Sequence, residues 1–326
     1  MTNYRTAESV SPRHPDKICD QISDAILDAY LARDPSSRVA IDVAGGHGTV
    51  FVTGEVTSKS KVDIESITKK IAGDVEVITR VVAQSPEISQ GVDTGGAGDQ
   101  GIMVGYATNE TEELLPLEVV LSRNLNQHLY ALWPHDGKTQ VTLRDGEITA
   151  IVASFQHAPS DTLRAAVIEW GHASPLARKS CAANLPSLHI NPAGDWHIGG
   201  FEADAGLTGR KLAVDNYGPR VPIGGGAFSG KDPSKVDRSA AYMARRIAID
   251  YLRRHNAHEV YVYLAYAIGY DQPLEATVSV DGRVQIVEGY NLTPRGIIEY
   301  LDLTRPIYQH TARYGHFGHS KFSWEL

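Results

Sequence analysis

The chain has 326 residues, of which 42% are hydrophobic and 21% charged, as is typical of a globular protein with two or three domains. Its formal net charge of −8 argues against general nucleic-acid binding, and no apolar run is long enough to cross a membrane. The only thiols, Cys19 and Cys181, do not make a disulfide framework, and no apolar leader follows Met1, so we expect a cytoplasmic protein.

The predicted elements follow one order three times: a helix, antiparallel strands and a second helix. Apolar stripes and capping residues predict helices at 15–33, from 63, at 117–132, from 161, at 236–254 and at 293–303. Alternating segments with turn signals predict strands at 39–43, 49–56, 140–143, 148–155, 260–267, 277–280 and 284–287.

This order predicts an α+β fold of three similar domains, which we place at 1–93, 94–198 and 199–326. Each antiparallel sheet would be covered by helices on one face. The other face must be buried against another repeat or another subunit.

The first candidate site is the tetrapeptide His-Pro-Asp-Lys at 14–17, at the expected start of the first helix. Free backbone N–H groups there favour anions, and the carboxylate of Asp16 can hold Mg²⁺, which itself binds phosphate oxygens. In the alternative reading, Asp16 only complements the helix dipole and His14 is a surface cap. Three more acidic side chains recur every four residues, and we expect a solvated or partner-pairing face rather than a metal site: Asp20, Asp24 and Asp28.

Two glycine-rich stretches resemble nucleotide-binding motifs, but their context excludes both. Residues 96–101 fit G-x-G-x-x-G, yet a polar loop precedes them and a strand-like segment follows, so they form a glycine loop that carries Asp99. Residues 225–231 fit G-x-x-x-x-G-K, but Asp232 stands where a P-loop needs Ser or Thr. A flexible backbone with the ammonium group of Lys231 remains.

Lys235 and Asp237 open the next predicted helix, so Asp237 mirrors Asp16 at the first one. Two carboxylates at two helix starts, with Arg210, Lys211 and Lys231 between them, would suit a metal-bridged polyphosphate. The alternative is an exposed charged loop.

Two weaker features concern single aromatic and imidazole side chains. Trp196 could stack on a base, although a lone Trp is more often found in a core or an interface. The histidines near the end lack a cysteine or acid at ligand spacing, so we expect hydrogen-bonding or surface roles for His310, His316 and His319.

Taken together, these segments resemble the methionine adenosyltransferase (S-adenosylmethionine synthetase) family. The matching motifs are Gly-Ala-Gly-Asp-Gln-Gly-Ile-Met-Val-Gly-Tyr at 96–106, Gly-Gly-Gly-Ala-Phe-Ser-Gly-Lys-Asp at 224–232, His-Pro-Asp-Lys at 14–17, Gly-Leu-Thr-Gly-Arg-Lys at 206–211, Asp-Pro-Ser-Lys-Val-Asp-Arg-Ser-Ala-Ala-Tyr at 232–242 and Tyr-Gly-His-Phe-Gly at 314–318. They occur in family order and span nearly the whole chain. The resemblance implies three similar domains around a pseudo-threefold axis and active sites shared within a homodimer, or within a tetramer made of two such dimers.

The implied reaction joins ATP to L-methionine. The methionine sulfur displaces triphosphate from C5′, and the enzyme then cleaves the triphosphate to pyrophosphate and phosphate. The methionine sulfur needs no general base to react. The leaving polyanion gains negative charge in the transition state, so preorganised cations are expected to contribute most to lowering the barrier. The implied cofactors are two Mg²⁺ ions, with K⁺ as a further cation.

The resemblance also assigns roles to individual residues. The contacts to the leaving oxygen and the triphosphate are His14, Lys138, Arg210, Lys211 and Lys231. The substrate-binding set is Glu55, Gln90, Asp99 and Lys235 for methionine, Asp136 and Asp204 for ribose, and Trp196, in place of the family's Phe, for adenine. The metal ligands are Asp16 and Asp237 for Mg²⁺ and Asp42 for the monovalent cation.

The chain departs from the family pattern at three places. Asp42 stands where the family usually has Glu, the region 73–84 is trimmed, and the segment 90–98 is shorter than the family's gating loop. We expect a shorter loop to change turnover more than metal dependence, because it would exclude water less well.

Two other functions stay open: a non-catalytic paralogue that binds nucleotide or S-adenosylmethionine, and a phosphotransferase. The intact set of charged residues disfavours the first, and the failed P-loop context disfavours the second.

Overall fold

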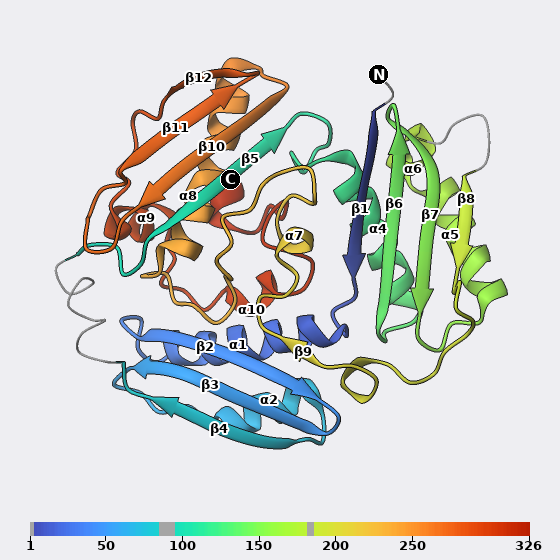
Figure 1. The fold of residues 1–326 in the computed structure, drawn as a ribbon, viewed down its shortest axis with the longest axis horizontal. Helices are drawn as coiled ribbons and strands as arrows, with labels where there is room; N and C mark the ends of the chain where they lie inside the picture. Colours follow the sequence, from blue (N-terminus) through green and yellow to red (C-terminus); the bar gives the residue numbers. More distant parts are fainter. Residues whose placement is uncertain (1–2, 85–94, 181–185) are drawn as a thin grey trace.

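The computed structural model describes residues 3–84, 95–180 and 186–326, which form three four-stranded sheets and their helices (Figure 1). The N-terminal sheet has the strand order β4 (Glu76–Val82), β3 (Thr49–Thr57), β2 (Arg38–Gly46), β9 (Gly206–Leu207). The central sheet has the order β1 (Tyr4–Val10), β6 (Gly137–Arg144), β7 (Glu147–Phe155), β8 (Ser187–Ile190). The C-terminal sheet has the order β12 (Arg283–Ile286), β11 (Glu275–Val280), β10 (Glu259–Tyr266), β5 (Gly101–Thr108). The predicted α+β class with three similar units is confirmed.

Every predicted helix is present. The longer helices are α1 (Pro15–Leu31), α2 (Ile64–Ala72), α4 (Leu117–Leu132), α5 (Ser160–Ala173), α8 (Val236–His255) and α9 (Pro294–Leu301). Short turns of helix complete the described parts: α6 (Pro175–Ser180), α7 (Leu212–Asp215), α10 (Tyr308–Thr311) and the 3₁₀ turns Gly200–Glu202 and Ser323–Glu325. The hairpins are antiparallel as predicted, but β3 pairs with β4 and β7 with β8 in parallel. In both cases helical segments carry the chain back to the same end of the sheet, as a parallel connection requires.

Each sheet includes one strand from a distant part of the chain. β1 pairs with β6, with Tyr4 opposite Arg144, and so joins the central sheet. β5 pairs with β10 in the C-terminal sheet, and β9 pairs with β2 in the N-terminal sheet. The three units therefore exchange strands in a cycle: each unit gives one strand to the sheet of another unit.

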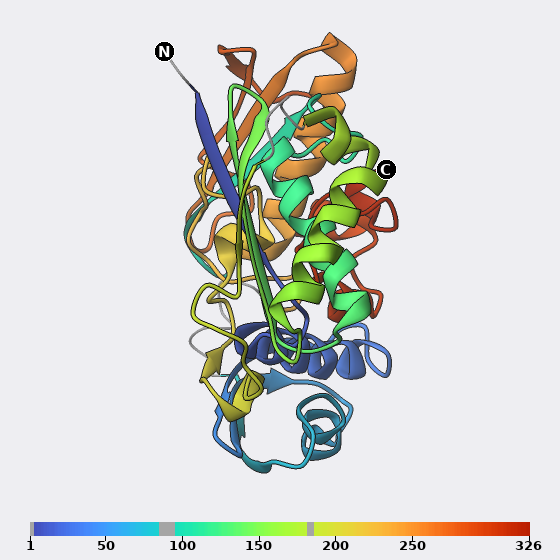
Figure 2. The same ribbon diagram turned by 90° about the vertical axis from the view of Figure 1, so that its right-hand side faces the viewer.

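Helices cover one face of each sheet and leave the other face open. Figure 2 shows the helices of the central unit on one side of its strands. In β2, the exposed Asp42 lies between the buried Ile41 and Val43, so this strand has a core face and an open face. On the core face lies α1, which is buried along almost its whole length. Among the described residues, no helix is both long and apolar enough to cross a membrane.

Candidate active site

The start of α1 is tightly packed against β9. His14 caps the helix, and its Nδ1 accepts a hydrogen bond from the backbone N–H of Asp16 at 3.2 Å. The Asp16 side chain is 1% exposed, and its Oδ1 accepts the N–H of Leu207 at 3.0 Å. A Cβ at Gly206 would lie 2.2 Å from the carbonyl carbon of Pro15, so only glycine lets β9 approach the helix this closely. The motifs at 14–17 and 206–211 therefore meet, as predicted.

Two cations of the second motif point at the Asp16 carboxylate. Lys211 Nζ lies 2.5 Å from Oδ2, and Arg210 Nε lies 3.4 Å from Oδ1. Burial alone would raise the pKa of Asp16, but the hydrogen bonds from Lys211 and from the Leu207 N–H lower it. Burial and then the charge of Lys211 lower the pKa of His14 to about 4, so the imidazole is neutral near pH 7. Because its Nδ1 accepts a backbone N–H, the proton is on Nε2, which is left to donate.

The start of α8 carries a second carboxylate–lysine pair. Lys231 Nζ contacts Oδ2 of Asp237 at 2.6 Å, and a Cβ at Gly226 would lie 2.5 Å from Cγ of Asp237. The same loop packs on β2, since Ile41 donates its N–H to the carbonyl of Gly230 at 3.0 Å. Lys235 pairs with the neighbouring Asp232. The predicted charged loop is thus anchored on the core and turned toward Asp237.

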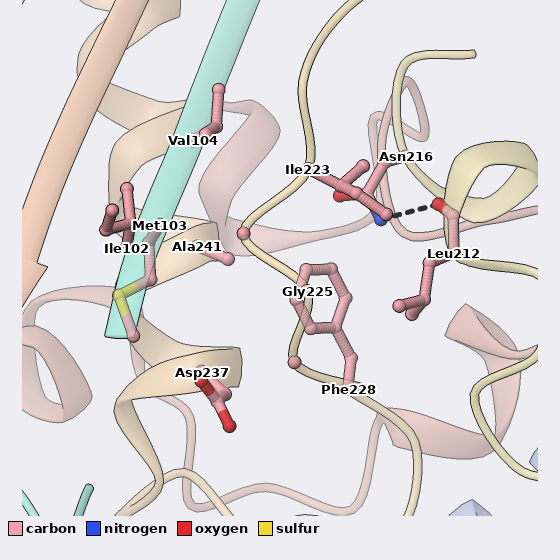
Figure 3. Close-up of a pocket in the computed structure, with 12 residues that line it drawn as sticks. Ile102, Met103, Val104, Leu212, Asn216, Ile223, Gly225, Phe228, Asp237 and Ala241 are labelled. Carbon is pink, nitrogen blue, oxygen red and sulfur yellow. Dashed lines mark hydrogen bonds between the residues drawn. The ribbon is translucent and has the colours of Figure 1, made fainter. Parts of the chain in front are cut away.

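A small pocket with both polar and apolar walls adjoins Asp237. Figure 3 shows its lining from four segments: β5, α7, the glycine-rich loop and the first turns of α8. The carboxylate of Asp237 and the ring of Phe228 lie at this pocket, together with Met103 of β5. β5, which directly follows the first glycine loop, therefore forms one wall of this pocket.

Two of the residues proposed to contact adenosine, Asp136 and Asp204, lie beside the start of α1. Asp136 Oδ2 accepts the N–H of Gly200 at 3.0 Å, and burial raises the pKa of Asp136. Lys138 and Asp204 both act electrostatically on His14, which places the three groups in one neighbourhood. Trp196 is half-buried, and its buried Nε1 has no hydrogen-bond partner in the structure. A buried donor without a partner is costly, which is consistent with a ligand acceptor at this position.

Other predicted site residues are not brought to this cluster. Asp42 and Glu55 lie on β2 and β3, and Asp42 is exposed on the open face of the N-terminal sheet. Asp99 is exposed, and its Oδ1 accepts the N–H of Gln100. Gln90 lies outside the described residues.

Carboxylates at the two helix starts fit a magnesium site that is completed by substrate. Among the described residues, no three His, Cys, Asp or Glu side chains have the spacing of a metal site. Mg²⁺ usually takes one or two protein carboxylates and fills its other positions with phosphate oxygens and water. Asp16 and Asp237 match that donor set.

The expectation of a solvated face on α1 is wrong. Asp20 and Asp24 are 1% and 0% exposed, and all three aspartates of the stripe accept backbone N–H groups from other segments. The other part of the expectation, that these aspartates pair with partners, agrees with the structure, and the partners belong to the same chain.

The hydrogen-bonding role expected for His316 and His319 is confirmed, because they contact the Tyr242 hydroxyl and the Tyr314 carbonyl.

Comparison with known proteins covers nearly the whole chain. Models of the N-terminal, central and C-terminal domains of S-adenosylmethionine synthetase match residues 2–88, 94–196 and 198–326. A protein named S-adenosylmethionine synthase from Treponema denticola is 43% identical, with 99% of this chain and 95% of that protein covered. Proteins of the same name from Wolinella succinogenes and Sorangium cellulosum are 42% and 41% identical, with 98% and 100% of this chain and 94% and 88% of those proteins covered. The first alignment runs over 371 positions against 326 residues here, so this chain is shortened internally.

Proposed function

Since the chain belongs to the S-adenosylmethionine synthetase family and is a methionine adenosyltransferase, we propose that it forms S-adenosylmethionine from ATP and L-methionine in two steps at the cluster between α1 and α8. The methionine sulfur donates an electron pair to C5′ of ATP while the C5′–oxygen bond breaks and its electrons leave with the triphosphate. Water then cleaves the triphosphate to pyrophosphate and phosphate.

One observation carries this proposal. Each of two carboxylates at a helix start, Asp16 and Asp237, contacts a lysine from a glycine-containing loop, Lys211 and Lys231. This arrangement combines hard oxygen ligands for Mg²⁺ with ammonium groups for phosphate oxygens. A site of this kind stabilises a departing polyanion, which is the difficult part of the reaction.

Each basic or neutral donor has a distinct part in the displacement. Neutral His14, with its proton on Nε2, donates a hydrogen bond toward the leaving oxygen and so stabilises its growing charge. The cationic side chains neutralise the triphosphate along its length: Lys138, Arg210, Lys211 and Lys231. Because their backbones are fixed by the core, little reorganisation is needed as charge develops.

Asp16 and Asp237 would hold two Mg²⁺ ions, and Asp42 would hold K⁺ at the open sheet face. The divalent ions would supply positive charge to the phosphate oxygens. The substrate side chains complete the site: Asp136, Asp204 and Trp196 at the adenosine end, and Glu55, Gln90, Asp99 and Lys235 at the methionine end.

We further propose that the active protein is a cytoplasmic homodimer with shared sites. Glu55 is on β3, whose side chains alternate between the core and the open face of the N-terminal sheet. That sheet also exposes apolar side chains, among them Phe51, Ile78 and Val82. Exposed apolar groups on a flat sheet favour burial against a second copy, which would bring such residues to its partner's site.

The test is an assay of the purified protein with ATP, Mg²⁺ and methionine. The proposal predicts S-adenosylmethionine, phosphate and pyrophosphate as products. A phosphotransferase would yield ADP instead. A non-catalytic paralogue would bind nucleotide or S-adenosylmethionine and yield none of these products, and either result would reject the proposal.

A further inference from the structure

The aspartate stripe of α1 contacts both cationic loops of the proposed site. Side chains at 16, 20, 24 and 28 recur on one face of the helix, because residues four apart are neighbours there. Each accepts at least one backbone N–H from a different place in the chain. The donors are Leu207 for Asp16, Gly209 for Asp20, Gly230 for Asp24, and Tyr308 with Gln309 for Asp28.

The loop that carries Arg210 and Lys211 is held from both ends. On one side, Asp20 Oδ1 accepts the N–H of Gly209 at 2.9 Å. On the other side, the buried Lys17 contacts Asp20 at 3.0 Å and Asp215 at 2.6 Å. Asp215 ends α7, directly after the loop. This ionic group therefore fixes the backbone before and after the two proposed phosphate contacts.

The loop that carries Lys231 is held in the same way. Asp24 Oδ1 accepts the N–H of Gly230 at 2.8 Å, while Arg238 Nη1 donates to the carbonyl of Lys231 at 3.0 Å. Asp24 and Arg238 are joined by two contacts of 2.7 and 3.0 Å, and both side chains are fully buried. Arg238 directly follows Asp237 on α8, so one ion pair also fixes the start of that helix.

Buried charges of this kind are costly to assemble unless they are fully paired, and their effect on stability alone is small or negative. A positional role explains their location better. We propose that Asp20 and Asp24 are positioning residues, which set the spacing between the two cationic loops across α1 and so preorganise the charges that receive triphosphate. The inference rests on the proposed function, since it identifies how the same site is held.

The stripe contains its own matched control. Asp28 lies on the same helix face and accepts the N–H groups of Tyr308 and Gln309, both at 2.9 Å. The segment that it holds, α10, carries no residue of the proposed site, and it touches Arg238 through the side chains of Tyr308 and Thr311 rather than through the backbone that Asp28 holds. Asp28→Asn therefore makes the same chemical change in the same helix without releasing a cationic loop.

The experiment compares Asp20→Asn and Asp24→Asn with Asp28→Asn in the full-length protein. Inorganic tripolyphosphate with Mg²⁺ is the probe, and its affinity is measured by calorimetry alongside the midpoint of urea unfolding. We expect Asp20→Asn and Asp24→Asn to bind tripolyphosphate about tenfold more weakly, because displacement of charges by a fraction of an ångström to an ångström has effects of this size or larger. Asp28→Asn should bind tripolyphosphate within about twofold of the wild-type affinity, even if its urea midpoint falls as much as the midpoints of the Asp20 and Asp24 variants.

A second variant guards against loss of folding. If Asp24→Asn does not fold, Arg238→Lys keeps a positive charge near Asp24 but cannot bridge both that carboxylate and the Lys231 carbonyl. It should show the same loss of tripolyphosphate affinity.

The inference is overturned if the variants at 20, 24 and 238 bind tripolyphosphate as tightly as Asp28→Asn. Wild-type protein that binds tripolyphosphate but forms no S-adenosylmethionine would reject the proposed function instead, and the comparison of variants would still decide the positioning role.

Discussion

The starts of α1 and α8 carry equivalent carboxylates in contrasting surroundings. Asp16 is 1% exposed and has contacts to a backbone N–H, a lysine and an arginine. The side chain of Asp237 is 15% exposed, and Lys231 is its ion-pair partner. His14 caps α1 with its side chain, whereas the residue before α8, Lys235, makes no side-chain cap.

The glycines at the two ends differ accordingly. Gly206 approaches the backbone of Pro15 and Asp16, which cannot move without disturbing the helix. At Gly226, the atoms nearest to an added Cβ all belong to the side chain of Asp237. The comparison indicates that the α1 end is a fixed wall of the site, while the α8 end has room for its carboxylate to adjust to a ligand.

Removal of an α8-side cation should have the largest effect. Lys231→Ala should slow the chemical step by about 10²- to 10³-fold, the usual effect of one lost donor to developing negative charge. Single-turnover formation of S-adenosylmethionine measures this step, while methionine binding should stay largely intact. An unchanged single-turnover rate constant would remove Lys231 from the leaving-group role.

A methyl group at the fixed end should reduce stability instead. Gly206→Ala places a Cβ 2.2 Å from the Pro15 carbonyl and 2.7 Å from the Asp16 nitrogen, both of them backbone. We expect the free energy of unfolding to fall by about 3 kcal/mol, as for severe overpacking. Urea unfolding tests this, and a loss below about 1 kcal/mol would show that β9 can shift away from α1.

The same methyl group at the adjustable end should affect turnover rather than folding. The atoms that Gly226→Ala would meet first belong to the Asp237 carboxylate, a side-chain group that can rotate, rather than to backbone. We expect a loss of about 1 kcal/mol or less in stability but roughly tenfold slower turnover, because the proposed metal ligand is displaced. Equal effects of Gly206→Ala and Gly226→Ala on both quantities would erase the contrast between the two ends.

The smallest expected effect concerns acid stability away from the site. Burial and then the charge of Arg123 lower the pKa of His319 from 6.5 to about 4. Between these values the unfolded chain binds a proton that the folded chain does not, so the free energy of unfolding falls as the pH drops through this window. His319→Gln keeps a donor for the Tyr314 carbonyl and should make that fall shallower in urea unfolding at several pH values. Parallel curves for variant and wild type would contradict the assignment.

Much of the fold was predictable because its signals are local. The bounds predicted for 117–132 match α4, and Asp281 and Gly282 adopt the positive φ angles that the hairpin turn requires. β1 and β9 were not predicted, because their partners lie more than a hundred residues away and short edge strands carry little local pattern. The parallel pairing of β3 with β4 and of β7 with β8 was not predicted either. Strand direction depends on the connection rather than on the strand's own residues.

The residues proposed for the chemistry could be named from the sequence motifs, but the contacts that hold them in place could not. Motif residues form two carboxylate–lysine pairs, Asp16 with Lys211 and Asp237 with Lys231. The pairs that hold them were missed, because acidic residues at four-residue spacing are typical of a solvated helix face. Only the fold shows that Asp24 is buried against Arg238 from a segment more than two hundred residues away.

The central claim is that the departing triphosphate is received between the two helix starts. A crystal structure with a non-hydrolysable ATP analogue, Mg²⁺ and methionine tests it most directly. The account predicts the phosphate chain between Asp16 and Asp237, bridged by Mg²⁺, with Lys211 and Lys231 turned to phosphate oxygens. A phosphate chain bound elsewhere, with both carboxylates still paired to their lysines, would contradict it.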